Sequence, residues 1–97
     1  MSQPVRPGPQ AHDLATARRN MVDGQVRTND VTDQRIIEAM LTVPREAFVP
    51  ERALAYLDLD LDVSEPAGGN RFLLKPVVVA RLLQAAEIGP ADSVLVV

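Results

Sequence analysis

The sequence predicts a mainly α-helical chain that leads into the first strand of an α/β fold. Apolar residues recur with helical spacing in several segments before residue 60. Residues 76–88 are also long and apolar enough for a helix, and Gly89 and Pro90 then provide a stop. The run over residues 94–97 is wholly apolar and mostly β-branched, which is typical of a buried strand. A helix joined to a strand by so short a connection is typical of an α/β unit.

Length and composition predict one small soluble domain. The chain has 97 residues, of which 46% are hydrophobic and 24% charged, as in ordinary globular proteins. The net charge of −3, without a basic cluster, argues against nucleic acid and against an anionic membrane as partners. The absence of cysteine excludes disulfides, cysteine-ligated zinc and thiol catalysis. No apolar run approaches the ~20 residues that span a bilayer, so we expect a cytoplasmic protein.

Residues 1–11 are expected to form a flexible tail, and residues 12–74 an N-terminal helical region. The tail is rich in proline and has too little apolar surface to offset the entropy of ordering it. The first helix should begin near Asp13 as its N-cap and weaken or end near Gly24. Its apolar face is expected to consist of Leu14, Ala17, Met21, Val22 and Val26.

A second helix is expected between residues 32 and 43. Asp30 or Thr32 can cap its first turn. Pro44 should end it, because a proline pushes the preceding residue, here Val43, out of the α region. The residues expected on its buried side are Ile36, Ile37, Met40 and Leu41.

A turn and a third helix should follow. In the turn over residues 45–49, Phe48 is the aromatic side chain expected to anchor the core. Arg45 lies just past a helix end, so we expect it to pair with a local carboxylate or to bind carbonyl groups. Pro50 suits the first turn of a helix over residues 51–57.

The segment between residues 58 and 75 is expected to be extended, with a loop in the middle. Acidic and apolar residues alternate over residues 58–63, as in a strand with one solvated side. Proline, glycine and asparagine over residues 66–70 predict the loop, and residues 71–74 return as a strand or extended run. In residues 76–88, three consecutive valines favour strand locally, but the length and the bracketing prolines favour helix.

Neither a metal site nor a catalytic residue is predicted. Three carboxylates have the spacing that opens a calcium-binding loop: Asp58, Asp60 and Asp62. That loop needs glycine and glutamate further on, where this chain has Val63 and Gly69. Ser64 and Ser93 have no base in a recognisable pattern, so nothing supports a nucleophilic role for either.

The segment around the second helix carries a specific pattern, Ala-Met-x-x-Val-Pro-Arg-x-x-Phe-Val-Pro. Its members are Ala39, Met40, Val43, Pro44, Arg45, Phe48, Val49 and Pro50. An Ala-Tyr-x-Asp segment follows, made of Ala55, Tyr56 and Asp58. Together with the helix and strand after residue 75, these patterns resemble the N-terminal part of protein-L-isoaspartate O-methyltransferases over about residues 14–97.

The resemblance implies an α/β fold, that of a Rossmann-like methyltransferase that uses S-adenosylmethionine (SAM). Residues 75–97 would be the first helix and first strand of that domain, still incomplete at Val97. The implied activity is methyl transfer from SAM to a carboxylate of a protein or peptide substrate. In the family, a glycine-rich turn that approaches SAM comes after this strand, so we expect residues 1–97 alone to be inert.

The same resemblance places residues 71–75 at the cofactor site. By position in the family motif, Leu74 and Lys75 are the candidate cofactor-binding residues. Phe72 and Leu74 stand where the family has threonine and serine, whose hydroxyl groups line the site at which the cofactor meets the isoaspartyl carboxylate. Neither replacement can donate a hydrogen bond, so we expect isoaspartyl methyl transfer to be weak even in a longer form of the protein.

Two further expectations concern the chain as a free molecule. The alternative to a methyltransferase segment is a free-standing helical interaction module without catalysis, which a stop codon directly after Val97 in the native gene would favour. The strand from Val94 to Val97 has only the short run over residues 71–74 as a neighbour. We therefore expect the isolated chain to form a homo-oligomer through this edge.

Overall fold

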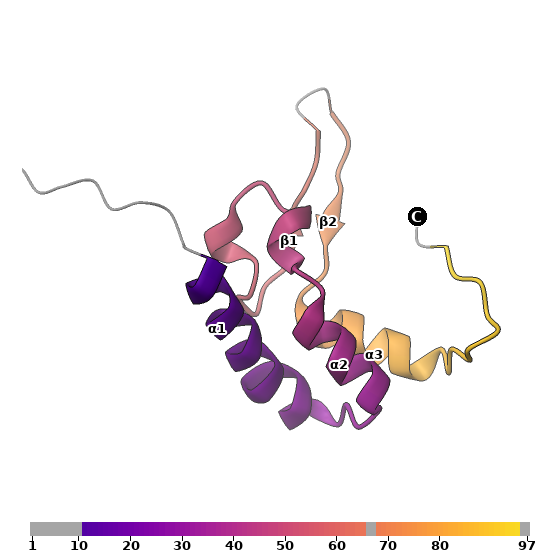
Figure 1. Cartoon of the computed structure of the whole chain (residues 1–97). Coiled ribbons are helices and arrows are strands. Elements are labelled where there is room, and N and C mark those ends of the chain that lie inside the picture. The colour runs from indigo at the N-terminus through magenta and orange to yellow at the C-terminus, as the bar shows by residue number, and fades with distance from the viewer. Residues whose placement is uncertain (1–10, 66–67, 96–97) are drawn as a thin grey trace, which may run out of the picture.

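The computed structural model describes residues 11–65 and 68–95. Within these ranges the chain forms helices α1 (Ala11–Met21), α2 (Gln34–Thr42) and α3 (Pro76–Ala85) and a hairpin of β1 (Leu61–Asp62) and β2 (Phe72–Leu73) (Figure 1). The described part is therefore mainly helical with a small sheet, as expected for part of an α/β domain. The predicted tail lies outside the described residues, apart from Ala11 at the start of α1.

The first helix agrees with the predicted apolar face. Its buried members are Leu14, Met21, Val22 and Val26, and Ala17 packs against them. After Met21 the helix continues as a π-helical turn (Val22–Val26) that contains Gly24, and then as a 3₁₀ turn (Arg27–Asn29). The predicted weakening near Gly24 is thus confirmed, because the regular α-helix ends three residues before it. Asp13 lies in the first turn of α1 and not before it, so the N-cap prediction is wrong.

The second helix ends as predicted but begins with a different cap. Asp33 is the N-cap, and its carboxylate accepts a hydrogen bond from the Arg35 backbone N–H at 3.0 Å. The predicted caps are wrong, because Asp30 adopts the left-handed conformation, with φ of 63°, that ends the preceding turn. Val43, just before Pro44, is extended and closes the helix. Ile37 is buried, and the other predicted residues of its apolar side, Ile36, Met40 and Leu41, pack against the core.

A glutamine of α3 holds the loop that precedes α2. The Gln84 Oε1 atom accepts hydrogen bonds from the backbone N–H groups of Thr32 at 2.8 Å and Asp33 at 3.1 Å. Its Nε2 atom donates to the Asp30 carbonyl at 2.9 Å. One side chain therefore satisfies three backbone groups that are more than 50 residues away in the sequence.

We expect Gln84→Ala to destabilise the fold by about 2 kcal/mol, because three backbone groups lose their partner at once. Urea unfolding should show the loss. Gln34→Ala, at an exposed position of α2, is the matched control and should change the free energy of unfolding by less than about 0.5 kcal/mol. Equal stability of the Gln84→Ala variant and the unmodified chain would show that these bonds contribute nothing net.

The predicted helix over residues 51–57 is wrong. The chain forms only a 3₁₀ turn (Arg52–Leu54), which follows another 3₁₀ turn (Arg45–Phe48). The carbonyl groups of Ala55 and Tyr56 accept hydrogen bonds from the side chains of Arg45 and Gln25, at 2.6 and 2.8 Å. These two bonds hold the chain beyond the 3₁₀ turn to residues 45 and 25.

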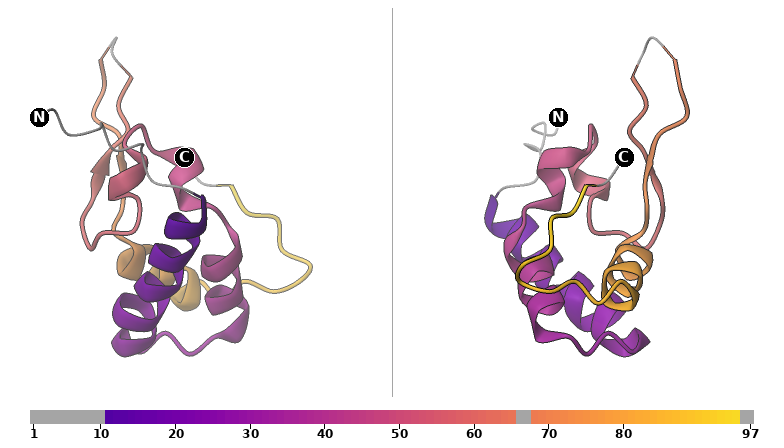
Figure 2. Two further views of the ribbon diagram at one scale, coloured as in Figure 1. Left: turned by 60° about the vertical axis from the view of Figure 1, so that its left-hand side comes forward. Right: turned by 90° about the vertical axis from the view of Figure 1, so that its right-hand side faces the viewer.

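The extended segments pair in a short antiparallel hairpin, but the predicted run over residues 58–63 is wrong at its start, because the chain bends over residues 57–59 and β1 begins at Leu61. Leu61 lies opposite Leu73, and Asp62 opposite Phe72. The Val63 N–H donates to the Arg71 carbonyl at 2.8 Å and continues the ladder. The predicted loop is present at the tip, where Gly68 and Gly69 have φ of 122° and 95°, although residues 66–67 lie outside the described ranges. The hairpin projects away from the three helices in both views of Figure 2.

The third helix is present but shorter than predicted. It begins at Pro76, contains the three valines, and ends at Ala85 instead of Ile88. The end comes early because Glu87 adopts the left-handed conformation, with φ of 51°. Ala80 is buried against the core.

The predicted strand after α3 is absent over the part that the structure describes. Ser93, Val94 and Leu95 have no regular secondary structure, and Val96 and Val97 lie outside the described residues. The exposed fractions of Val94 and Leu95 are 56% and 86%. The physical reason is the lack of a neighbour: no described segment pairs with residues 93–95, and the only ladder in the described part joins β1 and β2. Self-association through this edge stays a prediction.

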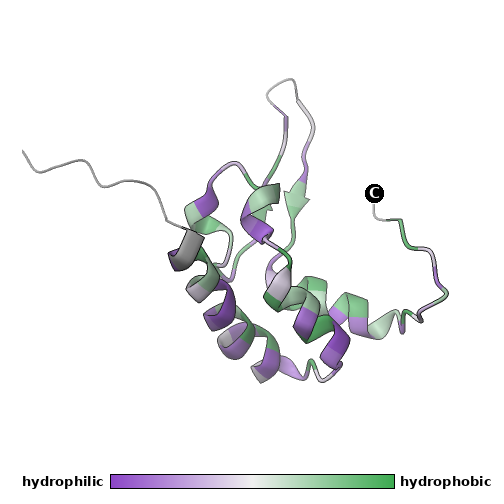
Figure 3. Cartoon of the chain, viewed as in Figure 1, coloured by the Kyte–Doolittle hydropathy of each residue, from purple (hydrophilic) through white to green (hydrophobic). Residues whose placement is uncertain are grey.

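The aromatic anchor of the core is Tyr56 and not Phe48. Tyr56 is 6% exposed and belongs to the buried cluster, whereas Phe48 is 64% exposed, so the prediction for Phe48 is wrong. Figure 3 shows hydrophobic residues along β2 and α3. Several large ones remain exposed in the described part: Phe48, Phe72, Leu74 and Leu82 are examples.

Candidate functional site

The candidate cofactor residues lie where β2 passes into α3. Lys75 is the N-cap of α3, and its carbonyl accepts hydrogen bonds from the N–H groups of Val78 at 3.0 Å and Val79 at 3.2 Å. The Leu74 side chain is partly exposed, and the Lys75 side chain is half-buried. This junction is therefore accessible from outside while its backbone is held by the first turn of the helix.

The peptide group between Leu74 and Lys75 is hydrogen-bonded to side chains through both its carbonyl oxygen and its N–H. The Leu74 carbonyl oxygen accepts a hydrogen bond from Nη2 of Arg45 at 2.7 Å. The Lys75 N–H donates to Oδ1 of Asp60 at 2.8 Å. One cation and one anion thus bind opposite ends of a single peptide dipole.

Arg45 is the buried member of this arrangement. The whole residue is 9% exposed, and its Nε atom donates to the Ala55 carbonyl at 2.6 Å. Burial lowers the pKa of the Arg45 guanidinium from its ordinary value, while the charges of Tyr56 and Asp60 act in the opposite direction. Arg45 thus binds carbonyl groups, which is one of its two expected roles, but they belong to residues 55 and 74 and not to the end of α2.

No hydroxyl group lies at the positions where the resemblance would place one. Phe72 is exposed on β2 and Leu74 follows it, so both present apolar groups. A serine does lie across the hairpin: the Ser64 Oγ atom accepts a hydrogen bond from the Arg71 N–H at 2.8 Å. Sequence reasoning found no role for Ser64, because the hairpin pairing that brings it to residue 71 is not visible in a local pattern.

An apolar cavity of about 170 Å³ lies beside the junction. Its lining comes from the specific sequence block, β2 and α3: Met40, Val43, Arg45, Phe48, Leu73 and Val79. The exposed ring of Phe48 is thus at the wall of this cavity and not in the core.

A second polar cluster joins α1 to the segment after α2, and no sequence pattern indicated it. Arg18 donates from Nε to the Tyr56 hydroxyl at 2.7 Å and from Nη2 to Oε1 of Glu46 at 2.9 Å. The Tyr56 hydroxyl in turn donates to Oε2 of Glu46. Each pair of the three residues is therefore bonded, and all three are largely buried.

The cluster shifts the pKa of each member. Burial and the hydrogen bond to Glu46 raise the pKa of Tyr56, and the bond to Tyr56 raises that of Arg18. Burial alone would raise the pKa of Glu46, but the hydrogen bonds from Tyr56 and Arg18, with the charge of Arg18, hold it below its ordinary value. The cluster therefore favours the protonated form of Tyr56 and the ionised form of Glu46. Its role is structural.

The folded chain should lose stability in acid through Glu46. Because the pKa of Glu46 is lower in the folded chain, its ionised form stabilises the fold above its ordinary value of 4.5, and this contribution is lost as the pH falls through the folded pKa. Urea unfolding at about pH 7 and about pH 3 should therefore show a smaller pH effect in Glu46→Gln than in the unmodified chain. Glu38→Gln, on an exposed position of α2, should keep the full effect. An equal pH effect in all three chains would contradict this assignment.

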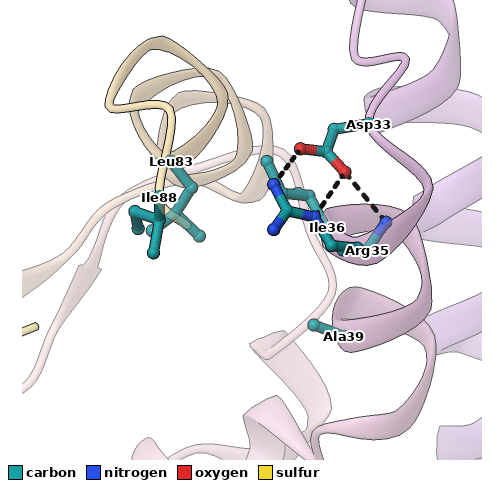
Figure 4. A pocket seen from close by; sticks show the side chains of 6 residues that line it. All are labelled: Asp33, Arg35, Ile36, Ala39, Leu83 and Ile88. Carbon is teal, nitrogen blue, oxygen red and sulfur yellow. Dashed lines mark hydrogen bonds and ion pairs between the residues drawn. The ribbon is translucent and has the colours of Figure 1, made fainter. Parts of the chain in front are cut away.

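A cavity between α2 and the end of α3 does not contain a catalytic arrangement. It measures about 260 Å³ and is drawn in Figure 4, with Ile36 and Ala39 of α2 facing Leu83 and Ile88. At its rim, Asp33 is bound by the side chain and backbone N–H of Arg35, which lower the pKa of the Asp33 carboxyl group. The carboxylate is thus neutralised as a helix cap, and the rest of the lining is apolar.

Within residues 11–65 and 68–95, no group of three or more histidine, cysteine or acidic side chains could hold a metal ion. None of the helices described is both long and apolar enough to cross a membrane.

The chain matches known proteins over most of its length. Residues 16–97 match the family model described as protein-L-isoaspartate(D-aspartate) O-methyltransferase. The chain is 43% identical over 84 residues to a protein-L-isoaspartate O-methyltransferase of Koribacter versatilis (strain Ellin345), which is 84% of this chain and 36% of that protein. It is 44% identical over 82 residues to protein-L-isoaspartate O-methyltransferase 2 of Anaeromyxobacter sp. (strain Fw109-5), with 82% and 32% covered.

A third relative, the protein-L-isoaspartate O-methyltransferase of Roseiflexus sp. (strain RS-1), is 40% identical over 85 residues, or 86% of this chain and 37% of that protein. The chain therefore spans about a third of the length of the curated relatives it matches. The match includes both the specific sequence block and the junction of β2 with α3.

Proposed function

The chain belongs to the protein-L-isoaspartate(D-aspartate) O-methyltransferase family, and from that premise we propose that it forms the N-terminal part of a methyltransferase that uses SAM. Its substrate would be a carboxylate in a protein or peptide. The observation that carries the proposal is the family match over residues 16–97. Residues 12–74 would form the N-terminal helical region, and residues 75–97 the first helix and first strand of a Rossmann-like domain.

The junction at Leu74 and Lys75 is the proposed place of contact with SAM. Bound SAM would supply a methyl group on a positively charged sulfur. Leu74 and Lys75 supply some, but not all, of the contacts that SAM would need. No ion pair joins Lys75 to a carboxylate in the described part of the chain, so its ammonium group is available for the carboxylate of the methionine moiety. Leu74 offers an apolar contact, while the hydroxyl groups typical of the family are missing.

The exposed apolar segment after α3 supports the fold part of the proposal. Val94 and Leu95 are strongly exposed, although both are typical of a buried strand. In a Rossmann-like sheet this segment would have parallel neighbours on both sides and helices on both faces. Further strands of a methyltransferase domain would thus supply the bonds that the described part lacks.

Residues 1–97 by themselves should have no methyltransferase activity. The proposed contact involves one helix N-terminus, whereas a Rossmann-like site needs a glycine-rich turn and an acidic residue on a second strand to hold its cofactor. Neither follows Leu95 within the 97 residues.

The experiment that tests the proposed function is a methyl-transfer assay. A chain continued past Val97 along the native reading frame to the length of its relatives should transfer label from SAM to an isoaspartyl peptide, and the matched aspartyl peptide is the control. The proposed function would be contradicted if the folded chain transferred no label to either peptide and none to any protein in a mixed protein pool.

A further inference from the structure

The peptide group between Leu74 and Lys75 makes two side-chain hydrogen bonds that the start of a helix does not by itself provide. It lies at the start of α3, where the first N–H groups of a helix have no partner within the helix. Its N–H nevertheless bonds to Asp60 at 2.8 Å, and its carbonyl bonds to Arg45 at 2.7 Å. Both partners are charged, and charge-assisted hydrogen bonds are about twice as strong as neutral ones.

The two charges match the direction of the peptide dipole. The positive guanidinium lies at the carbonyl oxygen, the negative end, and the carboxylate lies at the N–H, the positive end. A rotation of this peptide group would break both bonds and bring each charge toward the wrong end. The pair therefore selects one orientation of the backbone at residues 74 and 75.

The guanidinium that makes this contact is itself fixed. Arg45 is buried, and its Nε atom bonds to the Ala55 carbonyl at 2.6 Å. Its backbone opens the 3₁₀ turn over Arg45–Phe48 and is ordered by that turn. The arginine of the specific sequence block thus connects two distant segments, one at residue 55 and one at residue 74.

The carboxylate partner is one of three aspartates at alternate positions, of which the Ala-Tyr-x-Asp segment includes Asp58 and not Asp60. Asp58 is exposed and makes no hydrogen bond within the described residues. Asp62 bonds to the Ser64 N–H at 2.8 Å, which is a local turn contact. Asp60 alone among the three reaches α3. The chain bends over residues 57–59 and only Asp62 belongs to β1, so the fold gives each of the three carboxylates a different place.

We infer that Arg45 and Asp60 form a peptide clamp whose role is to position Leu74 and Lys75 for the cofactor. Both are positioning residues, because they act through the backbone of residues 74 and 75 and do not touch the reacting groups. The clamp sets the direction in which the Leu74 and Lys75 side chains leave the start of α3. This inference rests on the proposed function for its cofactor part, whereas the clamp itself can be tested without SAM.

The first experiment measures hydrogen exchange of the Lys75 amide by NMR in residues 1–97. Asp60→Ala should speed this exchange about tenfold, since the amide has no other partner. The exchange of the Ala80 amide, deeper in α3, should stay unchanged, which separates loss of the clamp from general loss of stability. Asp60→Asn keeps an oxygen acceptor and should restore part of the protection. Asp58→Ala is the matched control and should behave like the unmodified chain.

Two outcomes of this experiment would overturn the clamp. One is unchanged exchange of the Lys75 amide in Asp60→Ala. The other is an equal increase at Lys75 and Ala80, which would mean that Asp60 only stabilises the fold.

The second experiment measures SAM binding by calorimetry in a chain continued to the length of its relatives. Asp60→Ala should weaken binding about tenfold, Asp60→Asn should recover part of the loss, and Asp58→Ala should have no effect. Equal binding by the Asp60→Ala variant and the unmodified chain would contradict the positioning role. An unmodified chain that does not bind SAM would remove the proposed function and this role together, while the exchange experiment would still decide the clamp.

Discussion

Tyr56→Ala should reduce the free energy of unfolding by about 3–5 kcal/mol, which is a large part of the total for a small domain. Tyr56 is 6% exposed, and its ring fills the core between α1 and the segment after α2. The truncation also leaves Arg18 and Glu46 largely buried without the hydroxyl group that both of them bind. Chemical denaturation followed by circular dichroism measures the change.

Two variants separate the causes of this effect. Tyr56→Phe keeps the ring and should cost about 1–2 kcal/mol, the value of the lost hydroxyl bonds. Phe48→Ala removes the other large ring of this region and should cost less than about 1 kcal/mol, because Phe48 is mostly exposed. A Phe48→Ala variant less stable than Tyr56→Ala would contradict the arrangement of the core.

Restoring hydroxyl groups at the junction should increase isoaspartyl methyl transfer. The double variant Phe72→Thr with Leu74→Ser, in a chain of the relatives' length, should raise kcat/KM for an isoaspartyl peptide roughly tenfold per new hydrogen bond. The gain is expected because, under the proposed function, a hydroxyl donor at either position would bind the substrate carboxylate, which the apolar side chains cannot. Single-turnover measurements on the unmodified and double-variant chains provide the comparison.

The control for this prediction matches the size of the new side chains but adds no donor. Phe72→Val with Leu74→Ala shortens both residues to about the size of threonine and serine without a hydroxyl group and should give no increase. The same increase in both double variants would show that space, and not hydrogen bonding, limits the reaction. No increase in the hydroxyl variant would mean that the chain acts on a different carboxylate.

Local signals predicted the parts of the fold that depend on neighbouring residues. Pro44 ends α2 and Pro76 begins α3, because each proline restricts its own residue and the one before it. The apolar face of α1 follows from helical spacing alone. The hairpin loop follows from two glycines that adopt positive φ.

The remaining features depend on residues far apart in the sequence. Ala55 and Tyr56 lie outside a regular helix, and their carbonyl groups bind the side chains of residues 45 and 25. The sequence favours Phe48 for the core, whereas the structure buries Tyr56, whose hydroxyl group bonds to the distant Arg18 and to Glu46. Local patterns also do not single out Asp60 among the three aspartates.

The most direct test of the account is a SAM titration of two chains by calorimetry. Residues 1–97 should show no measurable binding, because the described junction offers one helix start and no glycine-rich turn. The chain continued past Val97 along the native reading frame should bind SAM with a dissociation constant in the micromolar range. Binding of that strength by residues 1–97, or none by the longer folded chain, would contradict the assignment of this chain as the first part of a SAM-dependent methyltransferase.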